Sequence, residues 1–105
     1  MPAFIQLQIT FPDKAEAETL AGKLLEQKRI ACAQIIGPVA SFYWWRGNPE
    51  SDEEYLMLAK TRADWFASIS AIVEKEHSYE CPQIVAVPLS CISVPYEKWL
   101  TEQLS

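Results

Sequence analysis

The residues of this chain best suited to binding a metal ion lie in one short stretch. His77 is the only histidine, and Cys81 follows it, with Glu76 and Glu80 close by. Imidazole and thiolate suit copper, so His77 and Cys81 form a candidate site for Cu²⁺ or another divalent cation. The alternative is structural, because a histidine near a helix C-terminus is favoured by the helix dipole without any ligand. A closed site would need further ligands, which neighbouring subunits would have to supply.

A second candidate site combines aromatic and basic side chains. The aromatic run at the end of a predicted strand is Tyr43, Trp44 and Trp45. Adjacent strand residues point to opposite faces, so a lone subunit would not easily bury all three. Packing against a neighbouring subunit is one interpretation. The other is a small-molecule cleft between subunits, in which Trp45, Lys60 and Tyr79 converge with His77 around an anionic metabolite.

Other reactive residues are better explained by structure. Cys32, Cys81 and Cys91 are an odd number at spacings typical of neither a disulfide scaffold nor a zinc motif, which favours buried thiols. Cys32 has no basic neighbour in sequence to stabilise a thiolate nucleophile. The acidic run from Glu50 to Glu54 lacks the ordered spacing of a calcium loop, and we interpret it as solvated charge.

Length and charge restrict the classes of function. A chain of 105 residues predicts a single domain over residues 1–105. The net charge of −5 argues against a nucleic-acid partner, because phosphate binding needs a basic face. The N-terminal residues do not resemble a secretory signal, and no window is apolar enough for a membrane helix, so we expect a cytoplasmic protein without membrane contact.

Hydrophobic periodicity predicts the elements that position these residues. The opening residues alternate as in a half-buried strand, and the next segment has the apolar spacing of a helical face. We expect a strand at 3–11, a helix capped by Asp13 that ends near Arg29, strands at 30–46 and 55–62 joined by a turn at 47–49, a helix capped by Asp64, a strand at 83–89, and a C-terminal helix after Ser93. Gly37-Pro38 should bend the second strand.

The resulting order is β-α-β-β-α-β with an extra C-terminal helix, which is typical of an α+β ferredoxin-like fold. Right-handed crossovers place both main helices on one face of a four-stranded antiparallel sheet. The apolar positions of the other face then need a partner.

The chain resembles the CutA family of divalent-cation-tolerance proteins. The resemblance is carried by Thr10-Phe11-Pro12-Asp13, Ile30-Ala31-Cys32-Ala33, Ser41 to Gly47 (SFYWWRG), Lys60-Thr61 and His77 to Pro82 (HSYECP). It implies a PII-like homotrimer, a role in copper or other divalent-cation tolerance, and no enzymatic activity. Three positions depart from the family pattern, since Ile9 and Glu76 replace proposed ligands and Gln83 replaces a glutamate.

Three further functions are alternatives to metal tolerance. A PII-like sensor or adaptor that binds a small molecule between subunits is the main alternative. An acylphosphatase-like hydrolase is disfavoured because residues 10–14 have neither the glycine nor the arginine of an anion-binding loop. RNA binding on the sheet face is disfavoured by the acidic charge.

Overall fold

A computed structural model describes residues 3–105 of the chain. Its elements are β1 (Phe4–Phe11), α1 (Lys14–Glu26), β2 (Cys32–Trp45), β3 (Asn48–Arg62), a 3₁₀ turn η1 (Ala63–Trp65), α2 (Phe66–Glu76), β4 (Ile84–Pro88) and α3 (Val94–Gln103). The predicted order of strands and helices is confirmed. None of the helices in the described part of the chain has the length and hydropathy needed to cross a membrane.

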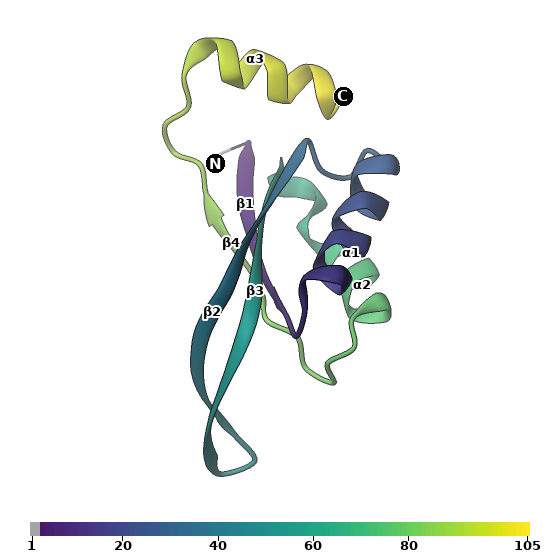
Figure 1. Cartoon of the computed structure of the whole chain (residues 1–105). Helices are drawn as coiled ribbons and strands as arrows, with labels where there is room; N and C mark the ends of the chain where they lie inside the picture. Colours follow the sequence, from purple (N-terminus) through teal and green to yellow (C-terminus); the bar gives the residue numbers. More distant parts are fainter. Residues whose placement is uncertain (1–2) are drawn as a thin grey trace.

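The four strands form one antiparallel sheet in the order β2-β3-β1-β4, with α1 and α2 side by side on one face (Figure 1). This is the ferredoxin-like arrangement that the sequence predicts. We call the face opposite α1 and α2 the open face. Its central residues are Gln6 and Gln8 of β1, Leu56, Leu58 and Lys60 of β3, and their partners Cys32, Gln34, Ile36, Val85 and Val87.

The main core lies between the sheet and the two helices. Leu7, Ile9 and Phe11 alternate along β1 toward α1 and α2, and each is fully buried. They pack with Leu24 of α1 and Ile69 of α2 in a single apolar cluster. Each large apolar side chain that is fully buried stabilises the fold by about 1.5–3 kcal/mol. This layer is therefore the main source of stability for the monomer.

The C-terminal helix packs elsewhere, across one end of the sheet (Figure 1). Leu100 of α3 and Leu104, which follows the helix, pack against Phe4, and Phe4 shares its side of β1 with Gln6 and Gln8. The rest of the open face keeps exposed apolar side chains, including Ile36 at 50 % and Val85 at 44 % exposure. The chain by itself therefore leaves apolar surface on the side that the sequence predicts to need a partner.

The hairpin differs from its prediction at the turn. Strand β3 begins at Asn48, which pairs with Trp45, so the loop is only Arg46-Gly47 rather than residues 47–49. Both loop residues have positive φ, 50° at Arg46 and 80° at Gly47, as a two-residue turn matching the strand twist requires. The acidic run 50–54 therefore belongs to the strand.

The end of this hairpin projects beyond the rest of the sheet (Figure 1). Residues 39–45 of β2 pair with residues 48–54 of β3, whereas β1 pairs with β3 only from Tyr55 onward. The bulge predicted at Gly37-Pro38 is confirmed as a register shift between Ile36 and Val39. A two-stranded ribbon is marginally stable alone, so this projection also favours support from a partner.

Two helix ends also differ from prediction. Helix α1 begins after Asp13, whose Oδ1 accepts a hydrogen bond of 2.8 Å from the Glu16 N–H, but it ends at Glu26, before Arg29. Lys28 has a φ of 57°, which ends the helical geometry. Asp64 does not cap α2, because its carboxylate accepts hydrogen bonds from Arg62 and the chain first forms η1. This contact lowers the pKa of Asp64.

Candidate functional site

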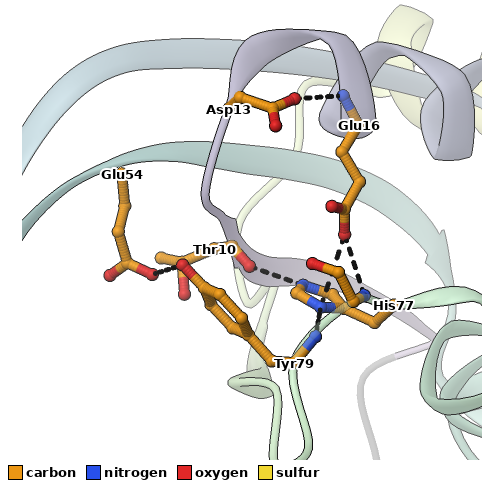
Figure 2. Close-up of polar contacts among 7 residues, drawn as sticks. Thr10, Asp13, Glu16, Glu54, His77 and Tyr79 are labelled. Carbon is orange, nitrogen blue, oxygen red and sulfur yellow. Dashed lines mark hydrogen bonds and ion pairs between the residues drawn. The ribbon is translucent and has the colours of Figure 1, made fainter.

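His77 lies at the C-terminus of α2 in a buried position behind β1 (Figure 2). Its ring stacks on Phe11 with centroids 4.6 Å apart and lies 4.8 Å from the ring of Tyr79. Nε2 is 2.7 Å from the Thr10 carbonyl oxygen, and Nδ1 is 3.0 Å from the Tyr79 amide nitrogen. Both ring nitrogens are therefore occupied by backbone groups.

These two contacts define the tautomer of His77. The Tyr79 N–H donates to Nδ1, so the ring proton lies on Nε2 and is donated to Thr10. The carboxylate of Glu16 completes the arrangement by accepting the Ser78 N–H at 3.0 Å, with Oε2 3.5 Å from Nδ1 (Figure 2). The imidazole thus links β1 to the segment after α2, and α1 supports that segment through Glu16.

Tyr79 connects this buried histidine to the projecting hairpin. Its hydroxyl donates a hydrogen bond of 2.8 Å to Oε2 of Glu54 on β3 (Figure 2). Burial, followed by the contact with this carboxylate, raises the pKa of Tyr79 above its ordinary value. The side chain therefore stays a neutral donor at physiological pH.

Tyr79 and Glu54 line a groove of about 700 Å³ between the hairpin and the segment after α2. We call it the hairpin groove. Its lining also includes Thr10, residues 41–45 of β2 and residues 78–83 of the segment before β4. The size lies within the range of small-molecule sites, and most of one wall is aromatic.

Two polar contacts hold the outer part of the hairpin groove. The hydroxyl of Tyr43 donates to Asp52 across the hairpin, and this contact raises the pKa of Tyr43 to about 12. At the tip, Arg46 forms an ion pair of 2.8 Å with Glu80 and lies 5.3 Å from the centroid of the Trp45 ring. The ion pair between Arg46 and Glu80 links the hairpin tip to the segment that carries Tyr79.

The structure brings together only part of the predicted small-molecule site. Trp45 and Tyr79 both line the hairpin groove, and His77 lies directly behind Tyr79. Lys60 does not line the groove. It pairs with Gln6 and Cys32 six residues along β3 from Glu54, which corresponds to about 20 Å of strand. Within one chain, Lys60 therefore cannot provide the charge for a ligand in this groove.

The predicted metal ligands differ in their surroundings. Cys81 is exposed and lines the hairpin groove, whereas His77 is buried with both nitrogens hydrogen bonded. Residues 3–105 contain no group of three or more His, Cys, Asp or Glu residues placed to hold one ion. Within this range, His77 and Cys81 are therefore not joined by a third such ligand. Metal binding at His77 and Cys81 stays a prediction that needs ligands from elsewhere and the loss of a His77 hydrogen bond.

Sequence reasoning missed Glu54. From the sequence, we interpret it as part of a solvated acidic run. In the structure Glu54 is only 7 % exposed, and its carboxylate accepts a hydrogen bond from the Tyr79 hydroxyl. Strand alternation could have found it: once β3 is extended back to Asn48, Glu54 falls on the same side as Leu56 and Leu58. The prediction of three buried thiols is also wrong, because Cys81 and Cys91 are exposed and Cys32 is half-buried.

Comparisons of this chain with known proteins all identify the same family. Residues 5–103 match the family model described as CutA1 divalent ion tolerance protein. A divalent-cation tolerance protein CutA from Archaeoglobus fulgidus is 40 % identical over 96 residues, covering 91 % of this chain and 93 % of that protein. A chloroplastic protein CutA 1 from Oryza sativa is 32 % identical over 91 % of this chain, which spans only 54 % of the rice protein.

Solved structures agree with the sequence comparison. The structure of a periplasmic divalent cation tolerance protein CutA from Archaeoglobus fulgidus superposes with a TM-score of 0.93 and 37 % identity, covering 97 % of this chain and 99 % of that one. A divalent cation tolerance protein from Thermus thermophilus superposes with a TM-score of 0.92 and 33 % identity, over 97 % of this chain and 99 % of that one.

Proposed function

Because the chain belongs to the CutA1 family of divalent ion tolerance proteins, we propose that it acts in divalent-cation tolerance, including tolerance of copper, as a homotrimer. The observation that supports the assembly most is the open face, where Ile36 and Val85 remain about half exposed on a sheet whose other face is covered by α1 and α2. Exposed apolar patches on one face are typical of interaction surfaces.

The homotrimer also accounts for the shape of the hairpin. Residues 39–54 extend past β1 as a two-stranded ribbon and carry Phe42 and Trp44, which are 80 % and 74 % exposed. A neighbouring copy that covers this ribbon would bury both side chains and stabilise the paired strands. We propose that the ribbon and the open face together form the contact between subunits.

A growth experiment tests the proposed role in tolerance. In a bacterial strain whose own CutA gene is deleted, expression of this chain should permit growth at higher Cu²⁺ concentrations than the empty vector does. The matched control is Ile36→Lys, which keeps the described core and places a charge on the open face. Equal growth with the chain and with the empty vector would contradict the proposal.

Metal binding itself is a separate part of the proposal. We propose that any Cu²⁺ site uses Cys81 and His77 together with ligands from neighbouring subunits. Isothermal titration with Cu²⁺ and Zn²⁺ should then show weaker binding for Cys81→Ser and for His77→Ala than for the native chain. Cys81 is exposed, so its replacement should preserve the fold. Equal affinity in all three proteins would remove both residues from the site.

A second candidate function is favoured by the hairpin groove. A cavity of about 700 Å³ with an aromatic wall and the polar side chains of Tyr79 and Glu54 has the composition of a small-molecule site. We propose as the alternative that the protein is a sensor or adaptor that binds a small molecule there. A cytoplasmic location and the lack of catalysis also stay predictions; the names of relatives include both chloroplastic and periplasmic proteins.

A further inference from the structure

The charge of the hairpin groove indicates what kind of small molecule fits it. Glu54 is only 7 % exposed and lines the groove, and its Oε2 accepts the neutral hydroxyl of Tyr79. Among residues 3–105, no Lys, Arg or His side chain forms an ion pair with Glu54. A buried carboxylate is costly without a compensating cation, so the groove has a place for positive charge.

Neither Arg46 nor Lys60 compensates the charge of Glu54. Arg46, at the tip of the hairpin, already pairs with Glu80 at 2.8 Å. Lys60 lies at the other end of the open face, beside Gln6. The anionic metabolite expected from Lys60 is therefore disfavoured for this groove, because its nearest charged lining group would repel it.

The aromatic wall favours a particular class of cation. Tyr43, Trp45 and Tyr79 line the groove beside Glu54. Arg46 lies 5.3 Å from the centroid of the Trp45 ring, so one face of this wall already interacts with a cationic group. Aromatic faces attract weakly hydrated cations, and quaternary ammonium groups are recognised by such walls. A small hydrated metal ion would instead need several oxygen, nitrogen or sulfur ligands, which the described residues do not bring together.

We propose that the hairpin groove binds a small organic ammonium ion, with its charged group between the aromatic wall and the carboxylate of Glu54. The proposal rests on the second candidate function, because it names the ligand class of that site. It does not depend on metal binding, so copper tolerance can hold or fail independently.

Titration with tetramethylammonium chloride, followed by ¹H–¹⁵N NMR of the tryptophan indole groups, tests the proposal. The signal of Trp45 should shift in a saturable manner, whereas those of Trp65 and Trp99, which lie outside the groove, should not. The neutral isostere tert-butanol should bind at least about tenfold more weakly, because it lacks the charge that Glu54 would compensate.

Two variants on the same strand separate the role of Glu54 from net charge. Glu54→Gln keeps an acceptor for Tyr79 but removes the charge, and it should weaken tetramethylammonium binding about tenfold or more. Glu53→Gln removes the same charge from the adjacent, exposed position that faces away, and its affinity should equal that of the native chain. Thermal melts of both variants establish that each is folded.

A third variant tests the aromatic wall without touching the buried carboxylate. Trp45 is 39 % exposed and shares its side of the hairpin with Glu54, so Trp45→Ala should fold and should bind tetramethylammonium several-fold more weakly. Four results would overturn the proposal: no saturable shift, equal binding of tert-butanol, unchanged affinity in Glu54→Gln, or shifts produced by Cu²⁺ and not by tetramethylammonium. Absence of a shift in the assembled protein would mean that a second copy of the chain fills the groove.

Discussion

At the scale of single residues, the structure assigns His77 a clear structural role. Its imidazole joins the Thr10 carbonyl to the Tyr79 amide while stacking on Phe11. These contacts fix the segment after α2, which forms one side of the hairpin groove. A histidine in this position supports the site from behind, whatever ligand the site binds.

The first prediction concerns this histidine. Replacing His77 by Ala should lower the free energy of unfolding by about 3 kcal/mol, since it removes two hydrogen bonds and a buried ring. Urea unfolding measures the change, with the exposed position Glu74→Ala on the same helix as the control. A loss below about 1 kcal/mol, typical of a surface substitution, would contradict the structural role.

The second prediction concerns the pH dependence produced by Tyr79. Its pKa is raised in the folded chain, so above pH ~10 the unfolded chain loses this proton while the folded chain keeps it. Stability should therefore fall as the pH rises above that value. The fall should be shallower in Tyr79→Phe, as measured by urea unfolding between pH 8 and 11. Parallel profiles for the two proteins would contradict the assignment.

At the scale of elements, the sequence predicts the order of strands and helices well because hydrophobic alternation reports burial directly. Leu7, Ile9 and Phe11 illustrate this, since each second residue of β1 faces the core. The turn was harder to place. Asn48 and Pro49 have strong turn propensity, yet Arg46 and Gly47 form the loop because strand pairing across the hairpin decides the register.

The candidate site was less predictable than the fold. Trp45 and Tyr79 could be recognised as lining residues, but their meeting depends on how the segment after α2 returns to the sheet. The position of Lys60 depends on strand register. The environment of Glu54 depends on a hydrogen bond from a residue 25 positions away in sequence. Strand alternation could have indicated which side Glu54 faces, but its partner is set by tertiary packing.

The third prediction concerns the bulge in β2. A Cβ atom at Gly37 would lie 2.7 Å from Cε2 and 2.8 Å from Cγ of the Tyr55 ring. Gly37→Ala should therefore destabilise the fold by about 1–3 kcal/mol through overpacking. Gly22→Ala provides the control, because a Cβ there meets no atom within 4 Å. Urea unfolding should show a large loss in the free energy of unfolding for Gly37→Ala only. Equal losses in Gly37→Ala and Gly22→Ala would contradict the predicted contact with Tyr55.

At the scale of the whole molecule, the two faces of the sheet are unequal. Helices α1 and α2 cover one face, while the open face retains exposed Ile36 and Val85 and the hairpin projects beyond its neighbours. Both features are explained by one proposal, that copies of the chain assemble through this side. The proposal also places the hairpin groove near the contact between subunits, where assembly and ligand binding would influence each other.

Light scattering tests this central claim most directly. The native chain should have about three times the mass of the 11.9 kDa subunit, and Ile36→Lys should be shifted toward the monomer. The matched control is Leu25→Lys on α1, since Leu25 is 51 % exposed, close to the 50 % of Ile36, but lies in the helical layer. This control should keep the native mass. A native chain that is monomeric, or a trimer unaffected by Ile36→Lys, would contradict assembly through the open face.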